Sequence, residues 1–425
     1  MHMARVTSDK MIPVHEAAEV LGVSADTIRR WHKKGLIKAT LGSNGDRLFS
    51  HEEIARVQSK SSSSDKPWKV LSAPKSKISS IELFCGAGGL ALGMHNAGIQ
   101  SKMLVDFDKN SIETIKRNRP DWNAHCDSVI DIDLDHMEGQ VDVMAGGFPC
   151  QAFSYAGKSL GFADTRGTLF YEYARLIKQV KPKIVLGENV KGLLNHDNGR
   201  TLNVITNELK RLGYRVGYKV LRSQFLDVPQ KRERLIIFGL REDVDSEILF
   251  PVEKDYTITM RAALKGVPKS DGQTYSESKR AIMELIPEGG YWRDLPLNLQ
   301  KKYMAGSFEL GGGKTGMARR LSWSEPSLTL TCNPAQKQTE RCHPKETRPL
   351  TVREYARIQT FPDDWEFVGS TSSQYKQIGN AVPVNLGYHI GLAIRKMLGN
   401  SPRGAEEAAE LKALEKPDLT LFDFE

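Results

Sequence analysis

A cysteine with unusual neighbours is the residue of this 425-residue chain that points most directly to chemistry. Cys150 lies between Pro149 and Gln151 and follows the apolar run at 141–145, which is typical of a buried strand. Active sites of α/β enzymes lie on loops at the carboxyl ends of such strands. A thiolate is a strong nucleophile, so the sequence predicts a catalytic Cys150 rather than a structural thiol.

Charged side chains accompany two further apolar runs. Glu188 follows the run at 182–186, which places a carboxylate at a neighbouring strand end. Arg232 and Arg234 come just before the run at 235–238, and on an extended backbone they point to the same face. These three residues therefore join Cys150 as catalytic candidates.

A glycine-rich turn follows the first apolar run of the main domain. Residues 84–89 (FCGAGG) allow the backbone to approach a ligand closely before a helix begins. Asp106 follows about twenty residues later, where a carboxylate can accept hydrogen bonds from ribose hydroxyls, and Asp127 is a candidate partner for an adenine amino group. Leu92 stands where the dinucleotide pattern has its third glycine. An adenosine-bearing ligand without a pyrophosphate is therefore predicted.

The elements that must position these residues alternate along the chain. Apolar runs separated by amphipathic stretches predict an α/β domain, with a sheet wrapped by helices. A loop-rich part follows from about Pro251, and regular patterns return at 352–359 and 385–398. The predicted divisions are a Ser-rich linker (59–78), a catalytic domain (79–250), a target-recognition domain (251–374), a segment that returns to the catalytic domain (375–400) and an acidic tail (401–425).

Residues 1–58 are expected to form a separate small domain. The stretch 11–37 predicts two helices around a turn at Gly22, with Ser24 as an N-cap, and 45–50 predicts a hairpin wing. The second helix carries Thr27, Arg29, Arg30 and Lys33. This order resembles the winged helix-turn-helix of the MerR type, which implies DNA binding. A helical protein-interaction module with solvated cations is the alternative.

Composition and charge bound the partners. The chain is 40% hydrophobic with a net charge of +8, which excludes a wholly disordered protein. No apolar run could cross a bilayer and no signal-peptide core is evident, so a cytoplasmic protein without a membrane partner is expected. Residues 1–77 and 251–347 carry net charges of +6 and +4, which favours a polyanionic partner contacted in two places. The five cysteines lack zinc-type spacing, so no metal is expected.

Seven motifs occur in one order and together resemble the cytosine-5 DNA methyltransferases of bacteria, over about 79–400. They are Phe84-x-Gly-x-Gly-Gly, Gly-Phe-Pro-Cys150-Gln, Arg166-Gly-x-Leu169-Phe, Glu188-Asn-Val, Gln230-x-Arg232-x-Arg234, Arg348-x-Leu-Thr-x-Arg-Glu and Gln377-Ile-Gly-Asn380-Ala-Val-Pro. The departures are Glu82, where the family usually has Asp, and Asp106, where Glu is common. The resemblance implies a Rossmann-like class I methyltransferase with a mixed doubly wound sheet.

The resemblance also implies a mechanism on a cytosine flipped out of a DNA duplex. Cys150 would add to carbon 6, Glu188 would protonate nitrogen 3, Arg234 would hold the carbonyl oxygen, and Arg232 would orient Glu188 or the DNA backbone. S-adenosylmethionine would be the methyl donor and S-adenosylhomocysteine the product. The expected donor-binding residues are Phe84, Gly86, Ala87, Gly88, Gly89, Asp106, Phe107, Asp127, Ser128, Pro149, Leu169, Asn380, Ala381 and Val382.

DNA contacts are expected in three places. The loop after Cys150 has the glycines and cations of a lid that closes on DNA, with Gln151, Ser154, Lys158 and Arg166 as contacts. The recognition segment offers Lys314, Thr315, Arg319, Arg320 and Thr329, which could instead only support loops. The first domain would bind the promoter of its own operon, or would add sequence-independent affinity for DNA.

The expected activity is therefore modification of a specific duplex site by a monomeric catalytic unit, within a restriction–modification system. A tRNA cytosine methyltransferase is one alternative, because one branch of the family uses the same motifs on RNA. A DNA-binding regulator with an inactive methyltransferase fold is the other. The intact set of Cys150, Glu188, Arg232 and Arg234 argues against the inactive regulator.

Overall fold

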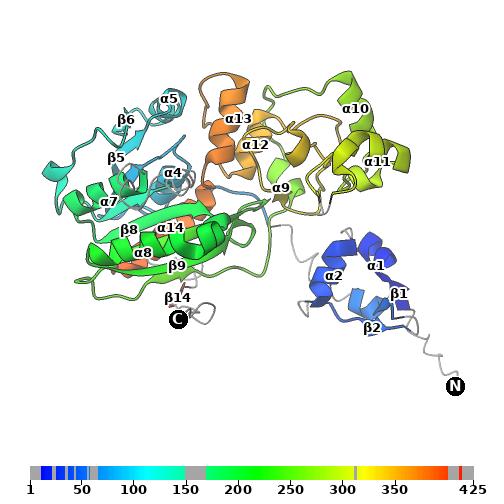
Figure 1. Ribbon diagram of the computed structural model, residues 1–425, viewed down its shortest axis with the longest axis horizontal. Helices are drawn as coiled ribbons and strands as arrows, with labels where there is room; N and C mark the ends of the chain where they lie inside the picture. Colours follow the sequence, from blue (N-terminus) through cyan, green and yellow to red (C-terminus); the bar gives the residue numbers. More distant parts are fainter. Residues whose placement is uncertain are drawn as a thin grey trace.

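The computed structural model describes residues 11–21, 25–33, 37–42, 45–54, 57, 66–148, 169–310, 314–400 and 411–413, and every structural statement below refers to these (Figure 1). No helix among them is both long enough and apolar enough to span a membrane.

A seven-stranded sheet forms the centre of the large domain (Figure 1). Its order is β6-β5-β4-β7-β8-β11-β9, in which the first five strands run parallel and β11 runs antiparallel to both neighbours. The mixed α/β sheet is therefore confirmed. The strands are β4 (Ser79–Leu83), β5 (Gln100–Asp106), β6 (Ala124–Cys126), β7 (Val143–Gly146), β8 (Ile184–Val190), β9 (Tyr214–Arg222) and β11 (Glu233–Arg241).

Alternating side chains bury both faces of this sheet. Along β7, Met144 packs with helices α7 (Leu169–Val180) and α8 (Arg200–Arg211), while Val143 and Ala145 pack with α4 (Gly89–Asn96) and α14 (Val384–Met397). This period of two is the geometry of an extended strand buried on both sides. Helix α5 (Lys109–Asn118) buries Ile112 and Ile115 in a third cluster.

Glycines bring α4 and α14 into very close contact. A Cβ atom on Gly93 would lie 2.3 Å from the carbonyl oxygen of Val384 and 2.6 Å from the Cα of Gly387. One on Gly89 would lie 2.3 Å from the carbonyl oxygen of Val382. Only glycine fits there, so the start of the catalytic fold and residues 382–387 are directly packed together.

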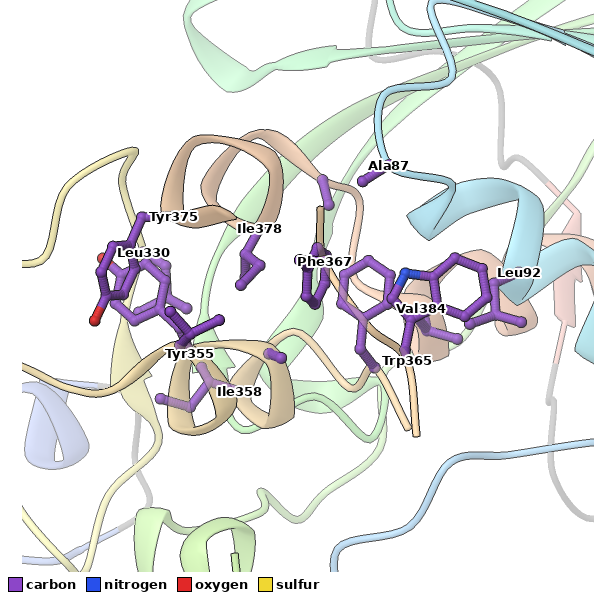
Figure 2. Close-up of a cluster of buried hydrophobic side chains, with 14 of the residues drawn as sticks. Ala87, Leu92, Leu330, Tyr355, Ile358, Trp365, Phe367, Tyr375, Ile378 and Val384 are labelled. Carbon is purple, nitrogen blue, oxygen red and sulfur yellow. The ribbon is translucent and has the colours of Figure 1, made fainter. Parts of the chain in front are cut away.

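Residues 350–378 share one buried core with the catalytic domain and with part of the loop-rich region. Figure 2 shows Tyr355, Trp365, Phe367 and Tyr375 in one buried cluster with Leu92 of α4. The cluster joins α12 (Val352–Ile358), α13 (Thr371–Asn380) and α9 (Met260–Leu264). The division predicted at 374 therefore cuts through a shared core.

The loop-rich region has a core of its own. It includes Met283, Trp292, Leu295, Met304 and Cys342, and it supports α10 (Glu277–Glu284) and α11 (Leu297–Met304). In Figure 1, α12 and α13 lie between these helices and the central sheet. Two short pairings complete this part: β10 (Gln230–Lys231) with β13 (Ser327–Leu328), and β12 (Leu249–Pro251) with β14 (Leu411–Ala413).

The linker predicted at 59–78 is too long. Residues 59–65 lie outside the described residues, whereas the chain from Lys66 onward packs on the large domain. The indole nitrogen of Trp68 donates to the Arg357 carbonyl oxygen (2.9 Å), and the Leu71 amide donates to Asn385 Oδ1 (3.0 Å). Burial of the aromatic ring outweighs the loop-like composition around it.

The first domain has the predicted helix pair and hairpin. Helices α1 (Val14–Val20) and α2 (Ala25–Lys33) pack with strands β1 (Met11–Pro13), β2 (Thr40–Leu41) and β3 (Arg47–Ser50), in the sheet order β1-β3-β2. Its core holds Ile12, Ala17, Ile28, Ile37, Phe49 and Ile54. The predicted turn at Gly22 and N-cap at Ser24 lie outside the described residues.

Candidate active site

Glu188 and Arg234 form an ion pair at the carboxyl end of β8. Arg234 Nε lies 2.7 Å from Glu188 Oε1, and both side chains are 13% exposed. The antiparallel register of β8 and β11 brings them together, because Glu188 pairs with Ile236, two residues from Arg234 on the same face. Arg234 Nη1 donates to the Glu233 carbonyl oxygen (2.8 Å), while Nη2 has no hydrogen bond to a described residue. Nη2 therefore remains available to a ligand.

The backbone that leads to Cys150 is held beside this pair. Asn189 is buried, and its Nδ2 donates to the Phe148 carbonyl oxygen (2.8 Å) while its Oδ1 accepts from the Val190 amide. A Cβ on Gly147 would lie 3.3 Å from Glu188 Oε2, so the chain passes next to the carboxylate. The residues that follow and were predicted to act, Pro149, Cys150, Gln151, Ser154, Lys158 and Arg166, lie outside the described residues.

Arg232 does not contact Glu188, and that predicted role needs correction. Its guanidinium is 1% exposed and donates to the carbonyl oxygens of Leu330 (3.3 Å), Gly379 (3.0 Å) and Ala381 (3.1 Å). Burial, followed by the nearby charge of Arg234, lowers its pKa to about 9. Arg232 is therefore a positively charged brace for the returning segment, and Arg234 makes the ion pair with Glu188.

Two glutamines complete this brace; Gln230 was named only as part of a motif, and Gln359 was not singled out from the sequence. Gln230 Nε2 donates to Gln359 Oε1 (2.8 Å), and Gln230 Oε1 accepts from the Leu330 amide (2.9 Å). Gln359 Nε2 donates to the carbonyl oxygens of Ile378 and Ala381. Gln230 and Gln359 are fully buried. Because a buried amide must be hydrogen-bonded, Gln359, between Ile358 and Thr360-Phe361, offered a signal in the sequence, whereas the charged residues after Gln230 conceal its burial.

The glycine-rich turn is tied to Asp106. The Gly86 amide donates to Asp106 Oδ2 and the Asp108 amide to Oδ1, each at 2.8 Å. Gly86 and Gly88 have φ values of 52° and 84°, and Phe84 (φ 57°) is in the same left-handed region despite its side chain. Burial raises the pKa of Asp106. Each carboxylate oxygen accepts one hydrogen bond here and has capacity for a second, from a ribose hydroxyl.

An exposed aromatic ring lies at the same edge of the sheet. Phe107 is 75% exposed and directly follows β5. Asp127 and Ser128 follow β6, and because β5 and β6 are parallel neighbours, the three residues lie at the same edge of the sheet. Asp127 is also exposed, Ser128 is half-buried, and the Cys126 thiol donates to the Phe107 carbonyl oxygen. An uncovered ring beside a carboxylate and a hydroxyl fits a planar base with an amino group.

The returning segment closes the other side of the turn. Ala381 and Val382 are nearly buried, and a Cβ on Gly89 would lie 3.1 Å from Ala381 Cβ. Asn380 is exposed, and its Oδ1 accepts from the Cys332 thiol (3.0 Å). Leu169 is half-buried at the start of α7. The described donor-binding candidates from β4, β5, β6 and α13 therefore gather around one edge, while Pro149 is not described.

Glu82 is a buried acid without a partner. It is 3% exposed on β4, and its Oε2 makes no hydrogen bond to a described residue. Burial, followed by the charges of Asp106 and Glu188, raises its pKa well above the ordinary value of 4.5. An unsatisfied carboxyl group beneath the glycine-rich turn fits a site that receives a cationic ligand.

The recognition candidates divide into exposed and buried groups. Thr315 is exposed, Arg319 is half-buried near the Tyr291 ring, and Lys314 Nζ donates to the carbonyl oxygens of Ser307 and Leu310. Thr329 donates to the Lys231 carbonyl oxygen (2.7 Å), so it supports a loop.

Arg320 needs correction as a DNA-reading residue. It is 4% exposed, and its guanidinium donates to the carbonyl oxygens of Met283, Ile286, His343 and Glu346 and to Thr347 Oγ1. Those acceptors need a cation among them, so this arginine organises the loops from inside.

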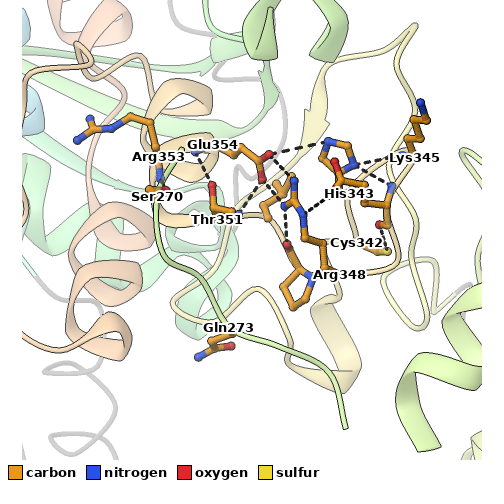
Figure 3. A network of polar contacts seen from close by, with 12 residues as sticks. Ser270, Gln273, Cys342, His343, Lys345, Arg348, Thr351, Arg353 and Glu354 are labelled. Carbon is orange, nitrogen blue, oxygen red and sulfur yellow. Dashed lines mark hydrogen bonds and ion pairs between the residues drawn. The ribbon is translucent and has the colours of Figure 1, made fainter. Parts of the chain in front are cut away.

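A polar network beside it joins the recognition region to α12 (Figure 3). Arg348 makes a two-bond ion pair with Glu354, with both N–O distances at 2.8 Å. Glu354 also accepts from the Thr351 amide, and Thr351 caps α12 in return. His343 Nδ1 accepts from the amides of Lys345 and Glu346. The Arg348 motif therefore holds the recognition region against α12.

In the first domain, Arg29 is exposed on α2. Thr27, Arg30 and Lys33 lie on the same helix, but their side chains are outside the described residues. Within the described part of the chain, no group of three or more His, Cys, Asp or Glu side chains could hold a metal ion.

Comparisons with known proteins give consistent results. A family model described as C-5 cytosine-specific DNA methylase matches residues 78–396, and one described as MerR family regulatory protein matches 14–49. The Type II methyltransferase M.Eco47II of Escherichia coli is 52% identical over 399 residues, which cover 90% of this chain and 95% of that relative. M.PspPI of Psychrobacter sp. (strain TA137) is 51% identical over 403 residues, or 92% and 97% of the two chains.

The solved structures show the same fold. A protein encoded within an E. coli prophage aligns with a TM-score of 0.57 and 24% identity, covering 76% of this chain and 100% of that one. A methyltransferase of Entamoeba histolytica aligns with a TM-score of 0.54 and 15% identity, covering 76% and 99%.

Proposed function

The chain belongs to the C-5 cytosine-specific DNA methylase family, and on this premise we propose that it methylates carbon 5 of cytosine at a specific duplex site. The observation that carries the proposal is the ion pair of Glu188 and Arg234 beside the backbone leading to Cys150. The relatives' names as Type II methyltransferases favour DNA over tRNA as the substrate, and modification within a restriction–modification system as the role. Because the proposed substrate is chromosomal DNA, the protein would act in the cytoplasm of a prokaryote.

The chemistry follows from what each residue can do to the ring. Carbon 5 of cytosine is a poor nucleophile, so Cys150 adds through its thiolate to carbon 6 and pushes electron density toward carbon 5. Glu188 supplies a proton to nitrogen 3, which limits the negative charge that builds up on the ring. Arg234 Nη2 donates to the carbonyl oxygen. Carbon 5 would then take the methyl group that the bound donor supplies. Its own proton would pass to solvent, the 5,6 double bond would re-form as the Cys150 thiolate leaves carbon 6, and Glu188 would recover its proton from nitrogen 3.

The residues around the glycine-rich turn fit S-adenosylmethionine. Asp106 would accept from the ribose hydroxyls, Phe107 would stack on the adenine, and Asp127 would accept from its amino group. Glu82 and the peptide groups of the turn would surround the methionine part. S-adenosylmethionine supplies an electrophilic methyl group when it is bound.

Replacement of Cys150 by serine tests the activity. Cys150→Ser should bind S-adenosylhomocysteine and duplex DNA as the wild type does, because the pocket and the DNA surface are unchanged. It should transfer no methyl group, measured as tritium moving from labelled donor to DNA. Transfer at the wild-type rate would refute the proposed mechanism.

Sequence specificity is proposed to reside in 251–347, with Lys314, Thr315 and Arg319 as contacts to DNA. Its own core and its basic charge support this, because a separately folded loop region can vary without disturbing the sheet. Replacing 275–342, which encloses that core, with the segment of another family member should change the methylated sequence. Methylome sequencing of the host reads the result, and an unchanged site would contradict the assignment.

The first domain is proposed to bind a second DNA site, the promoter of its own operon. The helix pair, the hairpin and the exposed Arg29 support DNA binding. The alignments with the two Type II relatives cover 90% and 92% of this chain. Residues 59–425 make up only about 86% of it, so both alignments must extend into the first 58 residues.

Footprinting of the full-length protein on its upstream region separates regulation from general affinity. Protection of a discrete upstream site, lost in Arg29→Ala with Arg30→Ala while methylation persists, supports autoregulation. Equal and weak protection along any duplex would leave only sequence-independent affinity.

A further inference from the structure

A cavity of about 710 Å³ lies where three distant segments of the chain meet. Pro67 and Trp68 come from the segment before the sheet, Arg357 comes from α12, and Trp323 comes from the recognition region. Helix α9 and the residue after it contribute Arg261, Ala262, Leu264 and Lys265. None of these residues belongs to the active site described above, and no carboxylate lines the cavity.

Both indole rings are fixed in place. Trp68 Nε1 donates to the Arg357 carbonyl oxygen, and the Arg357 guanidinium carbon lies 4.7 Å from the centre of the Trp68 ring. Trp323 meets His343 edge-on at 5.2 Å, and its amide and carbonyl groups are hydrogen-bonded to Glu288 and to the Arg261 amide. Two immobilised aromatic rings can bind a planar group with little loss of conformational entropy.

The cations of the cavity differ in availability. Arg357 is 7% exposed, and its five donors serve Asp363 and the carbonyl oxygens of Ala263, Lys265 and Gly266. Arg261 and Lys265 are exposed, and their side-chain nitrogens make no hydrogen bond to a described residue. Arg261 lies over the Trp323 ring, with its guanidinium carbon 5.7 Å from the ring centre. Two uncompensated positive charges therefore stand beside the rings.

We propose that this cavity is a nucleotide-binding site, separate from the catalytic pocket, in which the tryptophans contact a base and Arg261 with Lys265 holds its phosphate. A fixed aromatic platform beside unpaired cations is the arrangement that binds unpaired nucleotides. The volume lies within the range of small-molecule sites, which is roughly 300–1,000 Å³. The ligand is a free nucleoside phosphate or a nucleotide of an unpaired DNA strand, because both present the same base and phosphate.

The test uses the full-length protein saturated with S-adenosylhomocysteine, so that an added nucleotide cannot occupy the donor pocket. Isothermal titration calorimetry follows the binding of AMP, of adenosine and of the single-stranded tetranucleotide dT4. Binding of AMP shows a site for free nucleoside phosphates, and binding of dT4 alone assigns it to unpaired DNA. Adenosine, which lacks the phosphate, should bind at least tenfold more weakly than AMP.

Two variants and a matched control decide the assignment. Arg261→Ala with Lys265→Ala should weaken binding at least tenfold and should reduce its dependence on salt. Trp323→Leu keeps apolar volume and should also weaken binding. Lys269→Ala with Lys302→Ala removes two exposed cations that do not line the cavity, and should bind as the wild type does. Circular dichroism and S-adenosylhomocysteine affinity confirm folding.

Failure of AMP and of dT4 to bind the saturated protein would overturn the proposal. Equal affinity in the wild type and in the Arg261/Lys265 variant would also overturn it. Neither outcome depends on methyl transfer, so the result is independent of the activity proposed above.

Discussion

Replacing Arg232 by lysine separates two roles that a buried arginine near an active site can have. Arginine serves three carbonyl oxygens here, those of Leu330, Gly379 and Ala381. A lysine keeps the charge, but its three donors share one nitrogen, which cannot occupy both the Nη1 position at Leu330 and the Nη2 position at Gly379 and Ala381. Ala381 keeps a second donor from Gln359, whereas Leu330 or Gly379 is left unsatisfied.

The size of the effect follows from that count. An unsatisfied buried carbonyl group costs about 1–3 kcal/mol, and a lost hydrogen bond to a charged group costs about 1.5 kcal/mol or more. The docking of residues 379–382 should therefore weaken by about 2–4 kcal/mol. In the proposed donor site those residues form one wall, so we expect the dissociation constant of S-adenosylhomocysteine to rise at least tenfold, which is about 1.4 kcal/mol.

Isothermal titration calorimetry with S-adenosylhomocysteine measures this directly. The matched control is Arg241→Lys at the far end of β11, where the ion pair with Asp243 is partly exposed and worth little. That variant should bind the product as the wild type does. If Arg232→Lys kept full affinity but lost methyl transfer, Arg232 would act on the cytosine side and the brace interpretation would be wrong.

Two further predictions concern Glu82 and Asn189. The raised pKa of Glu82 means that the folded chain holds this proton more tightly than the unfolded chain. The contribution of this group to stability is therefore fully present below the ordinary pKa of 4.5 and is lost as pH rises through the folded-state pKa. Without ligand, Glu82→Gln should therefore stabilise the protein at pH 8 by about 1–3 kcal/mol, which raises Tm by a few degrees. The gain in Tm should be smaller at pH 5. A gain that grew toward pH 5 would contradict the expected direction of the pH dependence. Asn189→Ala removes the donor to the Phe148 carbonyl oxygen and should slow single-turnover methyl transfer more than tenfold, with S-adenosylhomocysteine affinity within twofold. The exposed Asn203→Ala is the control, and an unchanged rate in Asn189→Ala would show that the backbone before Cys150 needs no such support.

Strands with continuous apolar runs could be predicted from the sequence, because burial on both faces leaves a strong local pattern. The apolar runs at 81–84, 103–105, 141–145, 184–186 and 235–238 became strands β4, β5, β7, β8 and β11. The edge strand β9 was not predicted, because Arg215, Lys219 and Arg222 interrupt its apolar residues and only one of its sides is paired. Local patterns are weakest at a sheet edge.

The site shows a similar limit. The order of the motifs predicted that Glu188 and Arg234 belong to one site, but the sequence did not show which arginine contacts the carboxylate. Arg232 turns toward the returning segment because three carbonyl oxygens, 98 to 149 residues away in the chain, require a donor. Arg320 is similar, since a cation in a loop is equally compatible with solvent and with a ring of buried carbonyls. Hydrogen bonds to residues so distant in the chain cannot be predicted from the local spacing of residues.

The glycine contacts between α4 and α14 have a consequence for the newly made protein. Gly89 and Gly93, near the start of the sheet domain, are covered by Val382, Val384 and Gly387, which are synthesised almost three hundred residues later. A ribosome that has completed the whole sheet has therefore not yet supplied the residues that pack on α4 beside the glycine-rich turn. If the proposed donor site is correct, chains that terminate before residue 380 lack one wall of it, and translation must run nearly to its end before the enzyme can act.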